Sequence, residues 1–169
     1  MKVIDIKLLV MDVDGVLTDG GIIIHDNGTE SKKFHVHDGA WLRIWKRLGL
    51  QTAIITGRQC QAVEHRAREL EIDFVYQQAH DKLAVLEQLK KDSQVPTEQM
   101  AYIGDDLPDL PVMKRVGFAV AVADATEEVK LAAHYVTSVE GGRGAVQELI
   151  QLLLQRMNLW DQALERYRR

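Results

Sequence analysis

The stretch that decides the fold lies near the start of the chain and reads IKLLVMDVD from residue 6 to residue 14. Its first six residues form a short apolar run, and its length and branched side chains favour a buried strand over a helix. The run ends at two acids, Asp12 and Asp14. Carboxylates directly after a buried strand are typical of the ligand-binding edge of a parallel sheet. We therefore expect an α/β protein whose site lies at the end of this first strand.

Short apolar runs and stretches of helical periodicity alternate along the rest of the chain. The apolar runs predict strands at residues 52–55, 74–76, 100–103 and 117–122. Apolar positions three and four residues apart predict helices at residues 40–48, 61–70, 82–91, 107–115, 126–131 and 149–157. Strands that alternate with helices indicate a doubly wound, mostly parallel sheet with helices on both faces.

One insertion interrupts this alternation. Residues 26–28, DNG, are a strong hairpin-turn signal, so we expect a β-hairpin over about residues 20–36. His25, His35 and His37 fall in or beside it, but no cysteine or fixed ligand spacing accompanies them. Polar hairpin residues are therefore a better interpretation than a transition-metal site. The chain shows no linker or repeat, and we predict one domain over residues 1–169.

Composition excludes several classes of protein. The 169 residues are 46% hydrophobic and 27% charged, which is an ordinary globular balance. The formal net charge of −4 gives no broad basic face, so we expect no nucleic-acid partner. No window approaches the roughly 20 apolar residues of a membrane span, so we expect no membrane partner. The single cysteine, Cys60, favours a reducing compartment, and we expect a cytoplasmic protein with a buried, inert thiol.

Polar residues gather where the predicted strands end. This set comprises Asp12, Asp14, Thr56, Arg58, Asp105 and Asp106, with Lys82 close to the same edge. Converging carboxylates repel one another, and a divalent cation with oxygen ligands neutralises them, so we expect Mg²⁺ here. One carboxylate can attack phosphorus while a neighbour protonates the leaving oxygen and then activates water. The set therefore predicts phosphoryl transfer through an aspartyl nucleophile.

The order of these residues resembles the four motifs of the haloacid dehalogenase superfamily of phosphohydrolases. The first motif is similar to residues 12–18, DVDGVLT, and the fourth to residues 104–109, GDDLPD. Thr56 and Lys82 stand where the second and third motifs place their threonine and lysine. The resemblance implies a Rossmann-like fold. A lone Asp-x-Asp is a weak signal, whereas four motifs in order are a strong one.

The resemblance also implies a role for each motif residue. Asp12 would be the nucleophile and Asp14 the general acid and base, while Thr56 and Lys82 would bind the phosphoryl group. Mg²⁺ would be held by the Asp12 side chain, the Asp14 backbone carbonyl and Asp105. Support of the site would fall to two further carboxylates, Asp106 and Asp109. For Asp109, capping of the following helix is an equally good interpretation.

A narrower resemblance runs over nearly the whole chain, to the 3-deoxy-D-manno-octulosonate 8-phosphate (Kdo 8-phosphate) phosphatase family. It rests on residues 34–39, 56–58, 120–125 and 141–146. It implies a phosphatase of lipopolysaccharide biosynthesis in which a hairpin replaces the cap domain and a homotetramer closes each site. The spacing between Asp14 and Thr56 agrees, because it has room for a hairpin and a helix but no cap domain.

Further residues are implied to contact the sugar phosphate substrate. Arg58 and Arg66 match arginines of the family, Asp38 and Gly39 belong to the first shared stretch, residues 34–39, and Arg143 lies in a closing glycine-rich segment. Asp38 is also a reasonable N-cap for the helix expected from residue 40. Two positions depart from the family: it often has Arg in place of Gln147 and an Asn-Lys pair in place of Asp81-Lys82. These departures bear on which sugar is bound.

Three other functions remain open at this point. One is a phosphatase for a nine-carbon 2-keto-3-deoxy sugar acid 9-phosphate. Another is a phosphoacceptor signalling domain, but such a domain carries its acceptor Asp at the strand end where this chain has Thr56. The third is a sugar-phosphate binder without activity, against which the complete catalytic set argues.

Overall fold

Strand β1 (Leu8–Met11) forms the centre of a parallel sheet in the computed structural model, which describes residues 5–168. The other five strands are β4 (Gln51–Ile55), β5 (Phe74–Tyr76), β6 (Met100–Gly104), β7 (Phe118–Ala121) and β8 (Tyr135–Val136). Their order is β5-β4-β1-β6-β7-β8, and every neighbouring pair is parallel. The chain thus builds outward from β1 first on one side and then on the other, which confirms the doubly wound fold.

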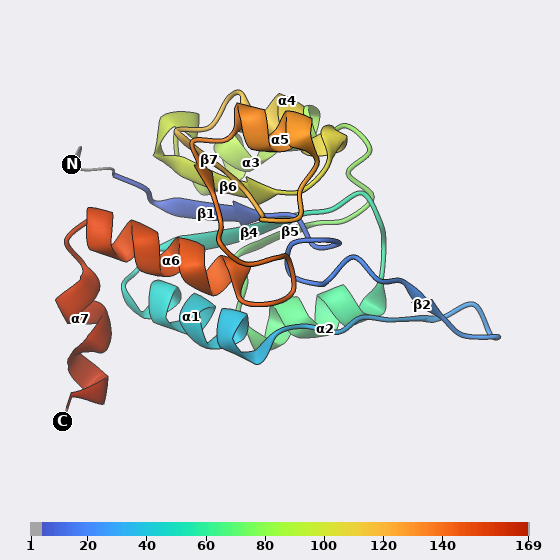
Figure 1. The fold of residues 1–169 in the computed structure, drawn as a ribbon, viewed down its shortest axis with the longest axis horizontal. Helices are drawn as coiled ribbons and strands as arrows, with labels where there is room; N and C mark the ends of the chain where they lie inside the picture. Colours follow the sequence, from blue (N-terminus) through green and yellow to red (C-terminus); the bar gives the residue numbers. More distant parts are fainter. Residues whose placement is uncertain (1–4, 169) are drawn as a thin grey trace.

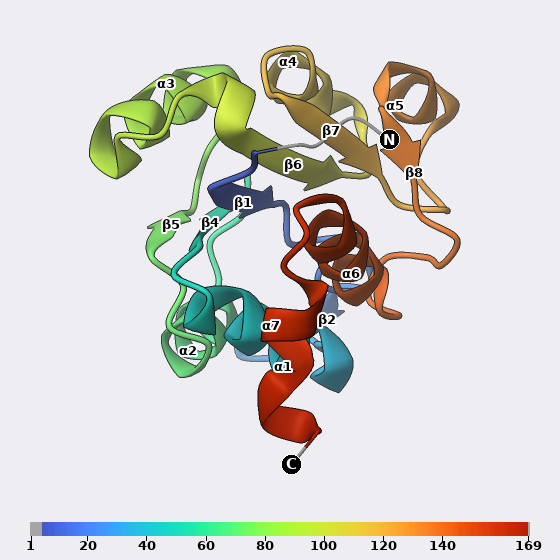
Figure 2. The ribbon, with the colours of Figure 1, turned by 90° about the vertical axis from the view of Figure 1, so that its left-hand side faces the viewer.

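Helices cover both faces of this sheet (Figures 1 and 2). One layer contains α3 (Lys82–Ser93), α4 (Leu110–Met113) and α5 (Glu127–Ala132). The opposite layer contains α1 (Val36–Arg47), α2 (Gln61–Glu69) and α6 (Ala145–Arg156), and α7 (Trp160–Leu164) follows α6. Short 3₁₀ turns lie at Thr97–Gln99, Leu107–Asp109 and Glu165–Tyr167. Within residues 5–168, no helix has the length and apolar character needed to cross a membrane.

The core explains why β1 reads as an unbroken apolar run. All four of its residues are completely buried, because helices pack on both faces of the sheet. Trp45 of α1 is also completely buried, and its indole N–H donates to the carbonyl of Gln51 at 2.9 Å. Trp41 stacks on Trp160 with 5.6 Å between the ring centroids, which brings α7 against α1. Cys60 is buried, as predicted.

The hairpin is present, but its strands are shorter than predicted. Strands β2 (Ile23–Ile24) and β3 (Glu30–Ser31) pair antiparallel and protrude from the body of the protein (Figure 1). Residues 32–35 leave the hairpin, and α1 begins at Val36 instead of residue 40. The N-cap of α1 is therefore His35 and not Asp38, which lies inside the first helical turn.

Other boundaries differ where prolines or glycines interrupt the pattern. The helix predicted over residues 107–115 is a 3₁₀ turn followed by the single-turn helix α4, and both segments contain a proline near their start. Helix α6 begins at Ala145, four residues earlier than predicted, directly after Gly144 in a left-handed conformation. The short elements β8 and α7 were not predicted, because each is too brief to show a period. Residues 1–4 and 169 of the predicted domain lie outside the described part of the chain.

Candidate active site

The carboxyl ends of β1, β4 and β6 open into a cleft of about 430 Å³. Its lining includes Asp12, Asp14, Thr56, Arg58, Lys82, Asp105, Asp106 and Asp109. The cleft lies where the winding direction of the sheet reverses, which is the general place for ligands in such folds. The structure thus brings together the residues of all four sequence motifs.

A buried lysine occupies the floor of the cleft between two aspartates. Its Nζ atom lies 3.0 Å from Asp12 Oδ1 and 2.6 Å from Asp109 Oδ1. Burial alone would lower the pKa of Lys82, but the two carboxylates together raise it above its usual range. Burial has the opposite effect on a carboxyl group and raises the pKa of Asp12 to about 6, although the positive charge of Lys82 opposes that shift. Lys82 is therefore a fixed positive charge beside the Asp12 carboxylate.

Asp109 holds the floor of the cleft in place. Its Oδ1 accepts from Lys82 and from the Tyr102 hydroxyl, each at 2.6 Å. Its Oδ2 accepts the backbone N–H groups of Asp105 at 2.9 Å and Asp106 at 3.2 Å. Both oxygens are thus occupied. The side chain makes no capping hydrogen bond to α4, the helix that follows it, so Asp109 supports the site and is not a helix cap.

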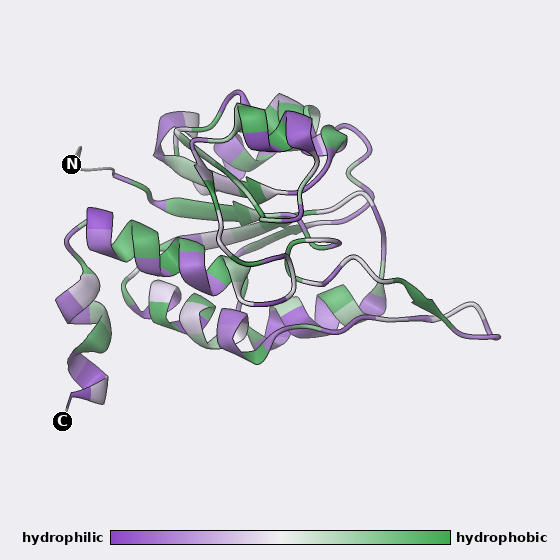
Figure 3. Cartoon of the chain, in the orientation of Figure 1, coloured by the Kyte–Doolittle hydropathy of each residue, from purple (hydrophilic) through white to green (hydrophobic). Residues whose placement is uncertain are grey.

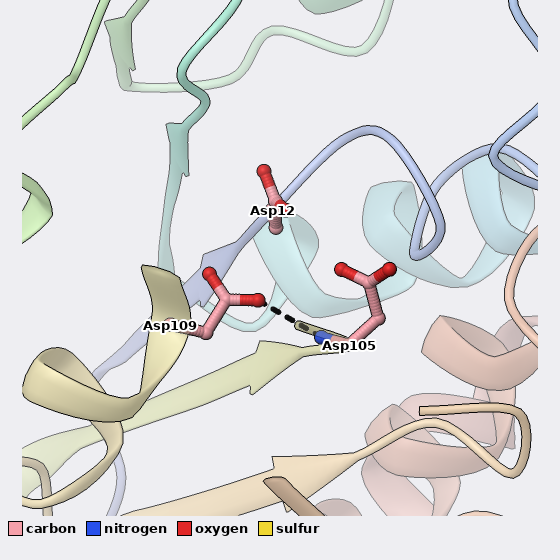
Figure 4. Close-up of side chains that lie close together, drawn as sticks. All are labelled: Asp12, Asp105 and Asp109. Atoms are coloured by element: carbon pink, nitrogen blue, oxygen red, sulfur yellow. Dashed lines mark hydrogen bonds between the residues drawn. The ribbon is translucent and has the colours of Figure 1, made fainter. Parts of the chain in front are cut away.

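Asp12, Asp105 and Asp109 lie close enough for their carboxylates to surround one cation (Figure 4). Their nearest oxygens are within 4.8 Å of one another. Burial raises the pKa of Asp105 to about 8, and the negative charges of Asp12 and Asp109 add to that shift. Such crowding of carboxylates favours a divalent cation with hard oxygen ligands, and Mg²⁺ fits this donor set. Because Asp109 is occupied, the available oxygens are those of Asp12 and Asp105.

The loop after β1 is shaped by close backbone contacts. Gly15 has a φ of +86°, and a Cβ atom there would lie only 2.1 Å from Asp105 Oδ2. Gly141 packs against the same loop, since a Cβ atom on it would lie 1.7 Å from the Gly15 carbonyl oxygen. The N–H of Gly142 donates to the Val16 carbonyl at 2.8 Å. Within the loop, the buried Thr18 hydroxyl accepts the N–H of Gly20 at 3.2 Å. The glycine-rich segment therefore serves to support the cleft of its own chain.

A second group of charges borders the cleft and was missed by sequence reasoning. The Lys32 ammonium, just after β3, forms an ion pair with the Asp14 carboxylate. Glu30 lies 3.9 Å from Lys32 and pairs in turn with Arg58. The alternation in residues 29–33, TESKK, was read only as part of a hairpin strand. No local signal distinguishes these residues from solvent-exposed hairpin charges.

Four of the residues implied to contact substrate lie outside the cleft. Arg66 donates to Glu69 Oε2 at 2.8 Å and covers Gly39, where a Cβ atom would meet its guanidinium at 2.4 Å. Asp38 is buried and accepts the backbone N–H of Gln147 at 2.8 Å. The Asp38 side chain of α1 thus caps the first turn of α6. Arg143 is exposed and lies 3.5 Å from Glu140. Arg58 does line the cleft, and Thr56 is a buried part of its wall.

The two departures from the family pattern have simple structural settings. Asp81 is the N-cap of α3, and its Oδ1 accepts the N–H groups of Leu83 and Ala84 at 3.1 Å. An asparagine oxygen can accept the same bonds, so Lys82 is held as well by either residue. Gln147 donates to Asp38 through its backbone N–H, so this hydrogen bond does not depend on which side chain stands at position 147.

The three histidines are not gathered into a metal site within residues 5–168. The His25 ring bonds to the Ser31 hydroxyl at 2.8 Å, across the hairpin. His35 and His37 face each other edge to face, with 5.2 Å between their centroids. The group able to hold a metal in the described part of the chain is the aspartate cluster.

This sheet, with its carboxylates and buried lysine at the reversal point, defines the class of haloacid dehalogenase-like hydrolases. Residues 74–149 match the model of that family.

Curated relatives make the assignment more specific. The chain is 48% identical to the Kdo 8-phosphate phosphatase of Yersinia pestis over 89% of its own length and 80% of the relative's. It is 45% identical to the Escherichia coli K12 phosphatase of the same name, over 96% of this chain and 86% of the relative. The chain therefore belongs to the 3-deoxy-D-manno-octulosonate 8-phosphate phosphatase family.

A solved structure agrees over almost the whole fold. The phosphatase of the same name from Moraxella catarrhalis superposes with a TM-score of 0.93 at 42% identity, over 96% of this chain and 94% of that one. That structure is a complex with a magnesium ion, a phosphate ion and a KDO molecule. The resemblance found in the sequence is thus confirmed.

Proposed function

We propose that this protein is a Mg²⁺-dependent phosphatase that hydrolyses Kdo 8-phosphate to Kdo and inorganic phosphate, in lipopolysaccharide biosynthesis. The observation that carries the proposal is the Asp12 carboxylate on the floor of the cleft, 3.0 Å from the buried Lys82 ammonium. A carboxylate in this position can act as a nucleophile on phosphorus, and the ammonium can neutralise charge on the transferring group. Membership of the phosphatase family supplies the substrate.

The first half of the reaction transfers the phosphoryl group to the protein. An Asp12 oxygen attacks phosphorus in line as the bond to the sugar oxygen breaks, and Asp14 gives its proton to that oxygen. Lys82 and the Thr56 hydroxyl bind the phosphoryl oxygens. Asp109 is a positioning residue, because its two carboxylate oxygens are occupied by Lys82 and by the backbone of Asp105.

In the second half, the Asp14 carboxylate takes a proton from a water molecule. The resulting hydroxide attacks phosphorus and releases phosphate from Asp12. Mg²⁺, held by the Asp12 and Asp105 carboxylates and by the Asp14 carbonyl, would neutralise negative charge at phosphorus and orient the group for transfer. The high pKa of Asp105 is consistent with a carboxylate that needs a cation beside it.

We further propose that the protein is a homotetramer of the cytoplasm. Asp38, Gly39, Arg66 and Arg143 lie away from the cleft of their own chain, so a substrate contact by Arg143 requires the cleft of a neighbouring subunit. The protruding hairpin carries three exposed isoleucines that a subunit contact would bury, at residues 22–24 (Figure 3). Sedimentation of the purified protein tests the tetramer, and a monomer at micromolar concentration would overturn it.

The test of the function is phosphate release from a panel of substrates. The panel contains Kdo 8-phosphate, the nine-carbon 9-phosphate homologue and simple hexose phosphates, each with Mg²⁺ and with EDTA. We expect metal-dependent turnover of Kdo 8-phosphate far above the others, and its loss in Asp12→Asn. The matched control is Asp161→Asn, an exposed carboxylate on α7, which should keep wild-type activity. Preference for the nine-carbon acid would change the assigned substrate and keep the mechanism. Near wild-type activity in Asp12→Asn would refute the role of Asp12 as nucleophile.

A further inference from the structure

The side of the cleft that carries Asp14 is bordered by a row of four alternating charges. It runs from Asp14 to Lys32, then to Glu30 and finally to Arg58, with both outer links closed as direct ion pairs. Asp14 and Arg58 follow strands β1 and β4 of the sheet, whereas Lys32 and Glu30 come from the hairpin base. The hairpin is therefore tied electrostatically to the two strand ends that flank the cleft.

Among these four charged residues, Lys32 differs from an ordinary hairpin lysine. Its side chain is only 1% exposed, and its ammonium is held between the Asp14 and Glu30 carboxylates. The next residue, Lys33, is 70% exposed and pairs with Asp19 at 2.9 Å. An exposed pair of that kind contributes little, whereas a buried lysine is retained only where partners compensate its desolvation. The burial of Lys32 therefore indicates a fixed position for its charge.

We propose that Lys32 is the positioning residue of Asp14, fixing that carboxylate toward the sugar oxygen of the substrate. The proposal rests on the proposed function of Asp14 as general acid. As Asp12 attacks, the bond between phosphorus and the sugar oxygen breaks, its electron pair stays on that oxygen, and the Asp14 proton moves there. Asp14 is left as a carboxylate facing the Lys32 ammonium. Lys32 thus supplies a partner for the charge that develops, while Glu30 and Arg58 keep the lysine in place.

The test compares two leaving groups in wild type and in Lys32→Met, which keeps the length of the side chain and removes its charge. Kdo 8-phosphate needs a proton on its alkoxide, whereas 2,4-dinitrophenyl phosphate leaves without one. Both are compared by kcat/KM, which covers only the steps up to departure of the leaving group. General acid catalysis is worth about 10²–10⁴-fold. We therefore expect a fall of about 100-fold on the sugar phosphate and less than about threefold on the aryl phosphate.

A double-mutant cycle tests whether Lys32 acts through Asp14. In an Asp14→Asn background, Lys32→Met should change kcat/KM for Kdo 8-phosphate by less than about threefold, because the proton donor is already absent. Lys32→Arg, which keeps the charge, should recover activity to within about tenfold of wild type. Lys33→Met is the matched control and should match wild type on both substrates.

The possible failures are distinguishable. Equal losses on both substrates would make Lys32 merely structural, and a fall that persists in the Asp14→Asn background would make it a direct substrate contact. Either result overturns the proposal. Absence of Kdo 8-phosphate turnover in wild type, with the aryl ester still hydrolysed, would instead overturn the proposed function. Aryl phosphate activity in Lys32→Met shows in the same experiment that the variant is folded.

Discussion

Replacing Asp109 with alanine removes one carboxylate from the floor of the cleft and leaves four donors without it. The residue is 1% exposed, so its hydrogen bonds are shielded from water in the folded protein. The Tyr102 hydroxyl and the N–H groups of Asp105 and Asp106 lose their acceptor, and Lys82 keeps Asp12 alone. We expect the fold to become less stable as well as the enzyme less active.

The size of the effect follows from the number and the burial of these bonds. Removing one partner of a buried ion pair costs about 3–5 kcal/mol, because the remaining charge is left without compensation. Typical domains have only about 5–15 kcal/mol of stability in all. With a urea dependence of about 2 kcal/mol per molar, the unfolding midpoint of Asp109→Ala should fall by about 2 M.

The assay is urea unfolding followed by circular dichroism, with a neighbouring carboxylate as control. Asp106 is exposed, and its carboxylate accepts the N–H of Leu107 at 2.8 Å. Asp106→Ala removes an ordinary cap and should cost about 1 kcal/mol. An equal midpoint for the two variants would refute the reasoning. It would mean that relief of repulsion from Asp12 and Asp105 offsets the lost hydrogen bonds.

Three further predictions concern the glycine-rich segment, the pH dependence of stability and the metal. Gly141→Ala should cost about 1–3 kcal/mol in urea unfolding and reduce activity, because its Cβ would meet the Gly15 carbonyl oxygen; unchanged stability would disprove that close contact. Burial alone would raise the pKa of Asp73, but bonds from Lys46 and Thr52 lower it overall. Wild type should therefore exceed Asp73→Asn in stability by about 1–2 kcal/mol at pH 7. The gap should begin to narrow below about pH 4, where the carboxyl of the unfolded chain protonates, and be lost as the pH falls through the lower pKa of the folded chain. A gap that stays constant in urea midpoints from pH 7 to 3.5 would contradict this. Dialysis against EDTA should abolish phosphate release and added Mg²⁺ should restore it, while activity that survives chelation would exclude a metal requirement.

Much of the site could be predicted because the local sequence pattern indicates where its motif residues lie. Asp12, Thr56 and Asp105 each stand directly after an apolar run, and a buried strand is readable from such a run alone. Parallel strands share one carboxyl edge, so residues at their ends must converge. The family resemblance then supplied the roles of these residues and the substrate.

The boundaries were less predictable where long-range contacts override local preference. Asp38 reads as an N-cap for its own helix, yet it caps α6 through the N–H of Gln147, 109 residues away. Gly144 reads as a loop residue, but α6 begins directly after it. The hydrogen bond from Gln147 to Asp38 joins α6 to α1, so the local sequence around either residue carries no sign of it.

The sequence by itself determined the alternation of strands and helices, the edge on which the chemistry lies and the four motifs. Only the tertiary structure decided that Asp109 bonds to four donors, that Gly141 packs against Gly15 and that Lys32 reaches Asp14. The physical reason is the range of the interactions. Periodicity reports which face of one element is buried, whereas the partner of a buried charge depends on how separate elements pack together.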